Sequence, residues 1–438
     1  ARWQDRIAIG VSVAGFAALM WMVGALSTRF GVPPGPTFNR AVTALRETAV
    51  APQRFYVTSN DFNGAKVSDA AAMSPGVTLV TSYFPDRDWR AGVRLIDAEG
   101  KTLHNWPIDL TKMLPGRTDD QDYIHGSYVF PNGDILFNVE YAGVVRMDRC
   151  GTVLWQNDSF GSHHSVYPAE DGGFWLSGNV TWRDDAEGKD YFDAYALMVP
   201  PINEDLFVKV SPDGEVQKSI SATEVLYKNR MQSVIVKMAR GKVIDTGDRR
   251  GISGDVFHVN DVEELSAEMA PAFPMFDAGD ILVSLRQLHM VMVVDPDDLR
   301  VKWYTITTSI SQHDPDFMAD GRIGIFDNNL DFTKRGSNSG GSRVVAVDPT
   351  TGAEEELYPN GGAPPFFSEY SGKWQALPNG NRLITIAREG RALEVTAGGK
   401  TVWEWITPLY GSDRVPELME ATRYDIPAEV ISGWTCPG

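Results

Sequence analysis

Three of the seven histidines in this chain of 438 residues occupy the same place relative to a turn. His125, His164 and His313 each precede the glycine of an Asn-Gly or Asp-Gly turn by eight residues. A neutral imidazole can act as a nucleophile and can accept or donate a proton near neutral pH. Because one residue type recurs at one register position, the spacing predicts that these three side chains share a site.

Other polar groups follow the same histidine-bearing segments. In "DVFHVNDVEEL", His258 and Asn260 are two residues apart, which places them on one face of a strand. The next apolar strand, "DILVSLRQLHMVMVVD", carries Arg286, which needs an anion or an acidic partner in such surroundings. A structural ion pair would satisfy it, but a guanidinium beside an amide also suits an oxyanion. His163, next to His164, is a further candidate for the same pocket.

Zinc or copper is the alternative ligand for clustered imidazoles. His163 and His164 are the one close pair, and the Arg286 cation would oppose a metal beside it. We therefore predict no metal and no cofactor. His104 and His289 are interpreted as structural, and Asp314 either orients His313 or caps a turn.

The segments that carry these residues are repeats. "HGSYVFPNGDILFNVEYAGVVRMDRCGTVLWQND" and "GKWQALPNGNRLITIAREGRALEVTAGGKTVWEW" align on their Asn-Gly turns and terminal tryptophans, and partial copies begin near Gly92, His164, His258 and His313. About six units of roughly 35 to 55 residues predict an all-β fold, a six-bladed β-propeller; a stacked solenoid is the alternative. Equivalent strand positions in a propeller face the central axis, so distant histidines would converge.

The N-terminal region indicates a membrane anchor. Residues 7–26, "IAIGVSVAGFAALMWMVGAL", carry no charge and are long enough to span about 30 Å of bilayer core. A secretory signal peptide is the alternative. The predicted organisation is a transmembrane anchor over residues 1–29, a linker and extension over 30–76, the propeller over 77–410, and a C-terminal tail packed on it over 411–438.

The net charge and the two cysteines bear on the binding partners and on the cellular compartment of the protein. The formal net charge of −18 argues against binding nucleic acid through its phosphates. Cys150 and Cys436 could form a disulfide in an oxidising periplasm, or could remain buried and unpaired.

Five ordered motifs resemble those of bacterial arylsulfate sulfotransferases, which are periplasmic six-bladed propellers. The motifs are "HHSVYPAEDGGFW", "FHVND", "ILVSLRQL", "QHDPDFMADGRIGIFDN" and "QALPNGNRLI…GRALEV…VWEW". The resemblance implies transfer of a sulfuryl group from a phenolic sulfate ester to a phenol through a sulfohistidine. It implies that His313 is the nucleophile, that Arg286 and His258 hold the sulfuryl oxygens, and that His164 or His163 completes the pocket. The residues expected to contact substrate are Asn260 and His125.

The chain departs from this family in two places. A serine follows the histidine doublet where an aspartate often stands. Residues 7–26 indicate a retained membrane helix, which would place the chain in the bacterial inner membrane with its propeller in the periplasm. Gly10, Ala14 and Ala18 form a small-residue face on that helix, which favours contact with other transmembrane subunits. The alternative function is therefore an accessory subunit of a larger membrane complex. A quinone-dependent dehydrogenase propeller is a third hypothesis, weakened by too few repeats and no calcium cluster.

Overall fold

The computed structural model of the chain divides into two compact units, Ala1–Phe55 and Tyr56–Gly438. The described residues are 20, 22–24, 54–58, 60, 62–114, 123–182, 198–238, 242–245, 250–333 and 336–436. Almost all of the predicted span over residues 7–26 lies outside them. Within these described ranges, no helix is long and apolar enough to cross a bilayer.

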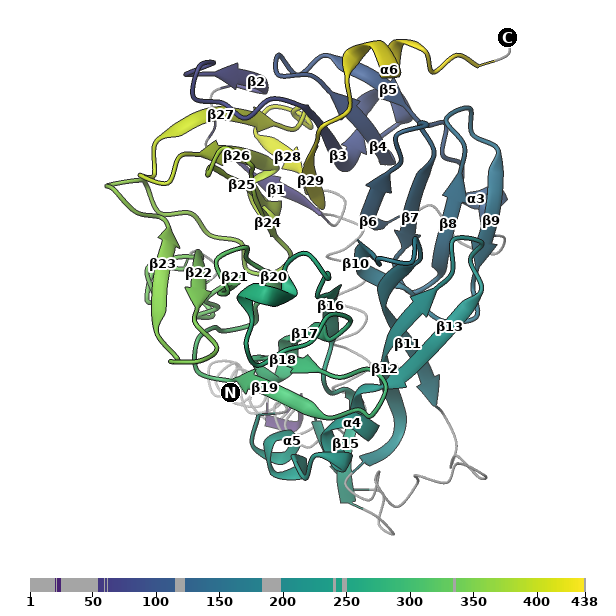
Figure 1. Ribbon diagram of the computed structural model, residues 1–438, viewed down its shortest axis with the longest axis vertical. Coiled ribbons are helices and arrows are strands. Elements are labelled where there is room, and N and C mark those ends of the chain that lie inside the picture. The colour runs from purple at the N-terminus through teal and green to yellow at the C-terminus, as the bar shows by residue number, and fades with distance from the viewer. Residues whose placement is uncertain are drawn as a thin grey trace, which may run out of the picture. The chain divides into compact units, whose positions relative to one another are not determined.

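Antiparallel sheets stand around a common centre in the second unit (Figure 1). Three of them are formed by consecutive strands: β6 (Ile124–Val129), β7 (Ile135–Val139), β8 (Gly143–Met147) and β9 (Val153–Asn157); β16 (Val259–Glu264), β17 (Ile281–Leu285), β18 (Met290–Val294) and β19 (Val301–Thr305); β20 (His313–Phe317), β21 (Ile323–Asp327), β22 (Arg343–Val347) and β23 (Glu354–Tyr358). A fourth consists of β24 (Lys373–Ala376), β25 (Arg382–Ile386), β26 (Arg391–Val395) and β27 (Thr401–Ile406), with β2 (Gly64–Val67) added at its edge.

The two ends of the second unit meet in a further sheet. β29 (Glu420–Tyr424) pairs with β3 (Val77–Phe84), which continues to β4 (Arg90–Ile96) and β5 (Thr102–Asn105). A late strand thus supplies the innermost position of the first blade and closes the ring. The predicted C-terminal tail, residues 411–438, contains β29, and the predicted linker and extension, residues 30–76, contains β2.

The remaining sheet is larger than a blade. β10 (His163–Pro168), β11 (Phe174–Trp182), β12 (Met198–Val210) and β13 (Val216–Ser221) follow the blade pattern, but β12 also pairs in parallel with β15 (Arg250–Asp255), which pairs with β14 (Lys242–Asp245). The reason is the length of β12, whose first part extends beyond β13. The predicted propeller is confirmed, but the prediction of six blades is wrong as stated: the described chain shows five regular blades, and this sheet is branched.

Short elements fill the connections between sheets. They are α3 (Leu110–Met113), α4 (Ala222–Lys228), α5 (Gln232–Met238), α6 (Ala428–Ser432), η1 (Pro85–Arg87), η4 (Ala270–Ala272), η5 (Arg286–Leu288), η6 (Ala387–Glu389) and the small sheet of β1 (Phe55–Val57) with β28 (Arg414–Pro416). A disulfide joins Cys150 to Cys436, with Cα atoms 5.4 Å apart, and ties the C-terminal segment to the β8–β9 turn.

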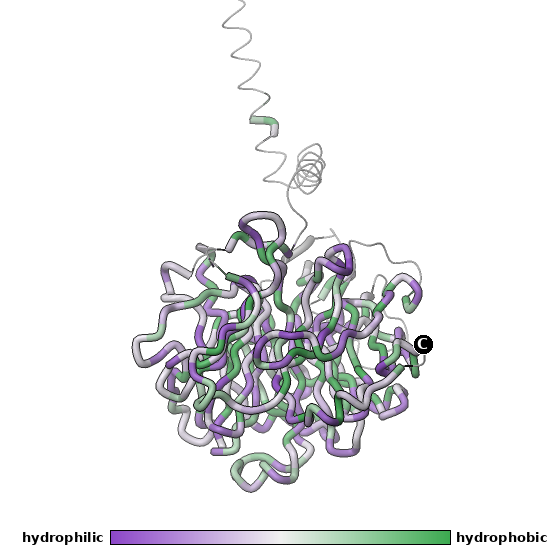
Figure 2. Tube along the Cα trace, turned by 90° about the horizontal axis from the view of Figure 1, so that it is seen from above, coloured by the Kyte–Doolittle hydropathy of each residue, from purple (hydrophilic) through white to green (hydrophobic). Residues whose placement is uncertain are grey.

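The core lies between neighbouring sheets. All five side chains of both β17 and β18 are buried, because both faces of this sheet pack against other sheets. Hydrophobic (green) and hydrophilic (purple) stretches alternate along the trace in Figure 2. Packing is tight enough to require glycine at some places: a Cβ on Gly324 would lie 1.9 Å from the Trp374 ring. Rigid sheets of this kind can hold side chains at their inner edges in fixed positions.

Candidate active site

Four innermost strands share an irregularity near their first residues. The pairing register shifts between Ile124 and Ser127 in β6, between His163 and Val166 in β10, between Val259 and Asp261 in β16, and between His313 and Asp316 in β20. Bulges of this kind bend a strand and redirect its side chains. They occur where the chain supplies polar side chains to the centre of the ring.

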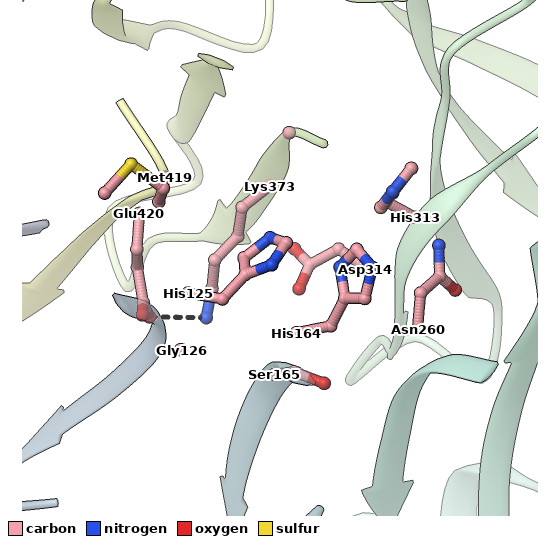
Figure 3. Close-up of a pocket in the computed structure, with 11 residues that line it drawn as sticks. His125, Gly126, His164, Ser165, Asn260, His313, Asp314, Lys373, Met419 and Glu420 are labelled. Carbon is pink, nitrogen blue, oxygen red and sulfur yellow. Dashed lines mark hydrogen bonds and ion pairs between the residues drawn. The ribbon is translucent and has the colours of Figure 1, made fainter. Parts of the chain in front are cut away.

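One pocket is lined by residues at these breaks and by residues of two further blades (Figure 3). Its walls are His125, Gly126, His164, Ser165, Asn260, His313, Asp314, Gly372, Lys373, Met419 and Glu420. It encloses about 310 Å³ of empty space, part of which is open to solvent. Four residues predicted from the sequence therefore meet in one cavity: His125, His164, Asn260 and His313.

Backbone strain accompanies this arrangement. His164, His258 and Asp314 have φ values of 57°, 53° and 47°, in the left-handed region that few residues other than glycine adopt. Such residues each cost about 1–3 kcal/mol and persist only where the surrounding structure holds them, most often at functional sites. The tightly packed inner strands provide that support here.

His313 is held at both ring nitrogens and is only 3% exposed. Its Nδ1 lies 2.6 Å from Asn328 Oδ1, and its Nε2 accepts a hydrogen bond of 3.2 Å from the Ser371 backbone N–H. Burial, followed by the charge of Arg286, lowers the pKa of His313 well below its usual 6.5. The imidazole is therefore neutral at physiological pH, with its Nε2 lone pair directed toward a single weak donor.

His164 and His258 form a pair. Their Nε2 atoms lie 3.0 Å apart, and His258 Nδ1 lies 2.8 Å from Asp255 Oδ2. Burial, then the neighbouring histidines, lowers the pKa of His164 well below 6.5. Burial alone would raise the pKa of Asp255, but the hydrogen bond and charge of His258 lower it overall. The pair can thus store one proton between its two imidazoles, with Asp255 orienting one of them.

The other two histidines of this cluster flank the pair. The ring centroid of His125 lies 4.0 Å from that of His164, and His125 Nδ1 lies 3.1 Å from Glu140 Oε2. His163 packs on Tyr141 in a tilted arrangement, with ring centroids 4.8 Å apart, and does not line the pocket formed by the described residues. Burial lowers the pKa of His163 to about 4. Of the doublet, the pocket is therefore lined by His164.

Arg286 and Asn260 reach the site differently from each other. Arg286 stands on η5, half-buried, and among the described residues it does not line the pocket, although its charge acts on His313. Its backbone N–H donates to the His258 carbonyl over 3.0 Å, which joins η5 to β16. Asn260 lines the pocket and donates from Nδ2 to the Gln312 carbonyl over 2.8 Å. One amide proton of Asn260 is thus already engaged.

Comparison with known proteins identifies the family. The profile described as arylsulfotransferase (ASST) matches residues 127–407, the greater part of the chain. The chain belongs to the arylsulfotransferase family. Comparison with curated proteins gave no match.

Solved structures similar to this arylsulfotransferase-family chain have low identity. They include a protein of unknown function from Bacteroides caccae (13% identity, TM-score 0.44, 76% of this chain and 94% of that one) and the WD40 β-propeller domain of Doa1 (10%, 0.40, 81% and 85%). Streptogramin B lyase is a third (10%, 0.40, 83% and 91%).

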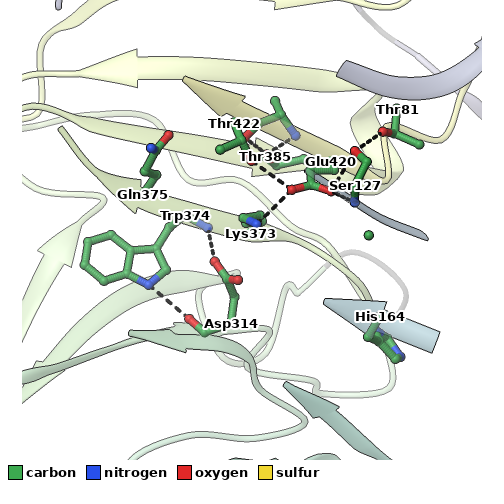
Figure 4. A network of polar contacts seen from close by, with 12 residues as sticks. Thr81, Ser127, His164, Asp314, Lys373, Trp374, Gln375, Thr385, Glu420 and Thr422 are labelled. Atoms are coloured by element: carbon green, nitrogen blue, oxygen red, sulfur yellow. Dashed lines mark hydrogen bonds and ion pairs between the residues drawn. The ribbon is translucent and has the colours of Figure 1, made fainter. Parts of the chain in front are cut away.

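The pocket also contains charged residues that the sequence analysis missed. Lys373 Nζ lies 2.9 Å from Glu420 Oε1, and Asp314 Oδ2 accepts the Trp374 backbone N–H over 2.7 Å (Figure 4). Burial would lower the pKa of Lys373, but Glu420 and Asp314 raise it overall. Burial raises the pKa of Asp314 to about 6, against the opposing effect of Lys373. A fixed cation thus lies between two carboxyl groups at the pocket wall.

A signal for Lys373 was present in the register of the repeats. Gly372 precedes the turn glycine Gly380 by eight residues, the spacing found for the three histidines, and it lines the pocket with Lys373. Glu420 had no such signal, because no Asn-Gly or Asp-Gly turn follows β29 in the sequence.

His104 and His289 lie in other surroundings. His104 Nε2 contacts the Arg149 carbonyl at 2.9 Å, and its ring packs on Trp106. His289 Nδ1 accepts the Ser311 backbone N–H over 3.0 Å. Across the described part of the chain, no group of three or more His, Cys, Asp or Glu side chains is arranged to hold a metal ion.

Proposed function

We propose that this arylsulfotransferase-family chain transfers a sulfuryl group from an aryl sulfate to a phenol, with His313 as the nucleophile. The observation that carries the proposal is the state of His313: a buried, neutral imidazole whose Nδ1 contacts Asn328, whose Nε2 accepts the Ser371 N–H over 3.2 Å, and which lines a pocket with further histidines. Membership of the family supports the substrate class.

In the first half-reaction, His313 Nε2 attacks sulfur. An N–S bond forms as the S–O bond to the aryl group breaks, and the electron pair leaves on the phenolic oxygen. That oxygen takes the extra proton that the His164–His258 pair carries beyond the one on each neutral ring, so that both imidazoles are left neutral. In the second half-reaction the acceptor phenol returns a proton to the pair, attacks sulfur and releases His313. The sulfohistidine is the intermediate that links the two steps.

Charge in the transition state spreads over the sulfuryl oxygens. The positive charge of Arg286, which acts on His313, is suited to stabilise them, and Asn260 has an amide proton beyond the one given to Gln312. Donors fixed in advance lower the barrier because they need little reorganisation during the reaction. The tightly held inner strands meet that requirement.

The proposed location is an oxidising compartment such as the periplasm. The disulfide between Cys150 and Cys436 supports it, since such bonds persist mainly in exported proteins. Anchoring through residues 7–26, and contact with other membrane subunits, stay predictions.

The test uses the full chain, a chromogenic aryl sulfate and phenol as acceptor. The wild type should form phenyl sulfate and gain the mass of one sulfuryl group when the acceptor is omitted. His313→Ala should lose both signals, whereas His104→Ala, which removes an imidazole outside the pocket, should keep them. A folded wild type that forms neither product nor adduct would overturn the proposal.

A further inference from the structure

Asn328 connects the nucleophile to a neighbouring loop. It follows directly after β21 and is fully buried. Its Oδ1 lies 2.6 Å from His313 Nδ1, while its Nδ2 donates to the backbone carbonyls of Ser368 and Ser371 over 2.9 and 2.8 Å. All polar atoms of this amide therefore have partners.

The partners determine which way the amide faces. Backbone carbonyls only accept hydrogen bonds, so the Asn328 nitrogen must face Ser368 and Ser371, and its oxygen must face the imidazole. An amide oxygen also only accepts, so the proton must reside on His313 Nδ1. The opposite tautomer would set the Nδ1 lone pair against Oδ1. The lone pair of the neutral ring is thus confined to Nε2.

The loop that Asn328 holds also contacts Nε2. Ser371 donates its backbone N–H to His313 Nε2 over 3.2 Å, while its carbonyl accepts from Asn328. Ser342 ties the loop further, because its Oγ donates to the Asn328 carbonyl over 3.0 Å and accepts the Ser368 N–H over 2.9 Å. Both nitrogens of the ring are therefore positioned by one hydrogen-bonded unit.

We propose that Asn328 is a positioning residue that fixes the Nδ1–H tautomer of His313, and that the Ser371 N–H passes from Nε2 to a sulfuryl oxygen as the N–S bond forms. The inference rests on the proposed function. When the S–O bond breaks, the proton stays on Nδ1 and keeps its hydrogen bond to Asn328 Oδ1, so the sulfohistidine carries a positive ring.

A neutral amide at position 328 suits both half-reactions. It cannot remove the Nδ1 proton, so the sulfohistidine ring keeps its positive charge and departs readily when the acceptor phenol attacks. A carboxylate at this place would stabilise the protonated ring and slow its release. The same carboxylate would be repelled by the carbonyls of Ser368 and Ser371. Asparagine therefore satisfies the loop without trapping the intermediate.

The experiment compares Asn328→Ala and Asn328→Asp with a matched control, Asn329→Asp. Asn329 also donates from Nδ2 to two carbonyls, those of Ser339 and Gly341, over 3.1 and 2.9 Å. It thus copies the loop bonds of Asn328 without its bond to the nucleophile. The full chain is labelled with ¹⁵N-histidine for NMR, and single-turnover sulfation and steady-state transfer are measured on each variant.

The wild type should show His313 as the Nδ1–H tautomer, and Asn328→Ala should show a mixture with sulfation slowed by roughly 10²–10⁴-fold, as expected for a wrong tautomer. In Asn328→Asp the acid limb of kcat/KM should move up by about 1 pH unit or more, and release of the sulfuryl group should slow more than its uptake. Asn329→Asp should match the wild type within about twofold.

Two results would overturn the inference. One is a wild-type tautomer and sulfation rate in Asn328→Ala. The other is an equal loss in Asn328→Asp and Asn329→Asp, which would assign a purely structural role to the loop bonds. The NMR measurement needs no turnover. If the wild type had no activity, the proposed function would be refuted, but the tautomer of His313 in each variant would still test the role of Asn328.

Discussion

The Nε2 atoms of His164 and His258 lie 3.0 Å apart, although the two residues are 94 positions apart in the sequence. His164 lies in β10, whereas His258 directly precedes β16 of another sheet. Two nitrogens at this distance must share a proton, since two lone pairs would repel each other. Asp255 accepts from the far side of His258 and so favours placing that proton between the rings. The arrangement suits protonation of a leaving phenolate.

Replacing His258 by alanine should lower kcat by roughly 10²–10⁴-fold for phenyl sulfate, because the proton of the leaving group would be lost. The loss should be much smaller for a nitrophenyl sulfate, whose phenolate is stable without a proton. The measurement is kcat against the pKa of the leaving phenol, with a steeper slope expected in the variant. A loss of equal size across the whole series would contradict this role.

His163 should make the protein sensitive to acid. Burial lowers its pKa from 6.5 to about 4, so below pH 6.5 the unfolded chain binds a proton that the folded chain does not. The free energy of unfolding should therefore fall as the pH drops through this window, by about 3 kcal/mol for this group. Urea unfolding of wild type and His163→Gln at pH 7 and pH 4.5 checks this. The difference between the two proteins should shrink or reverse at the lower pH; a constant difference would refute it.

Lys373→Met should destabilise the fold, because Glu420 is 4% exposed in its side chain and would lose its cation. The expected loss is about 2–3 kcal/mol, below the range for a fully buried pair, since a fifth of the Lys373 side chain is exposed. The control is Lys373→Met with Glu420→Gln, which removes both charges and should recover part of the loss. Equal stability of the single and double variants, measured by denaturant unfolding, would contradict the pairing.

Gly126→Ala should damage the site while the propeller persists. A Cβ at Gly126 would lie 2.3 Å from the His164 carbonyl and 2.9 Å from the Val166 nitrogen, so β10 would have to move. A displacement of about 1 Å at a catalytic group costs roughly 10²-fold in rate. Gly398→Ala, where the nearest atom would lie 3.9 Å away, is the control. Circular dichroism reports whether the fold persists, and kcat reports the state of the site. An unchanged kcat in Gly126→Ala would contradict the prediction.

The sequence by itself determined the propeller and the convergence of three histidines. Turn glycines at Gly133, Gly172 and Gly321 fix the hairpins locally, and the spacing back from each turn then fixes which residue begins the innermost strand. Local chemistry of this kind needs no knowledge of distant partners. The same register, applied at Gly380, indicates Gly372, the neighbour of Lys373 in the pocket wall.

Only the tertiary structure decided the rest. Whether His163 or His164 lines the pocket depends on a bulge in β10, and the branching of its sheet depends on how far β12 extends. Glu420 reaches the site because β29 pairs with β3, more than three hundred residues earlier. The side chain of Asn328, directly after β21, donates hydrogen bonds to the backbone carbonyls of Ser368 and Ser371 in a distant loop. Such contacts arise from pairing between segments that are distant in the sequence. The pattern of residues along one strand therefore cannot predict them.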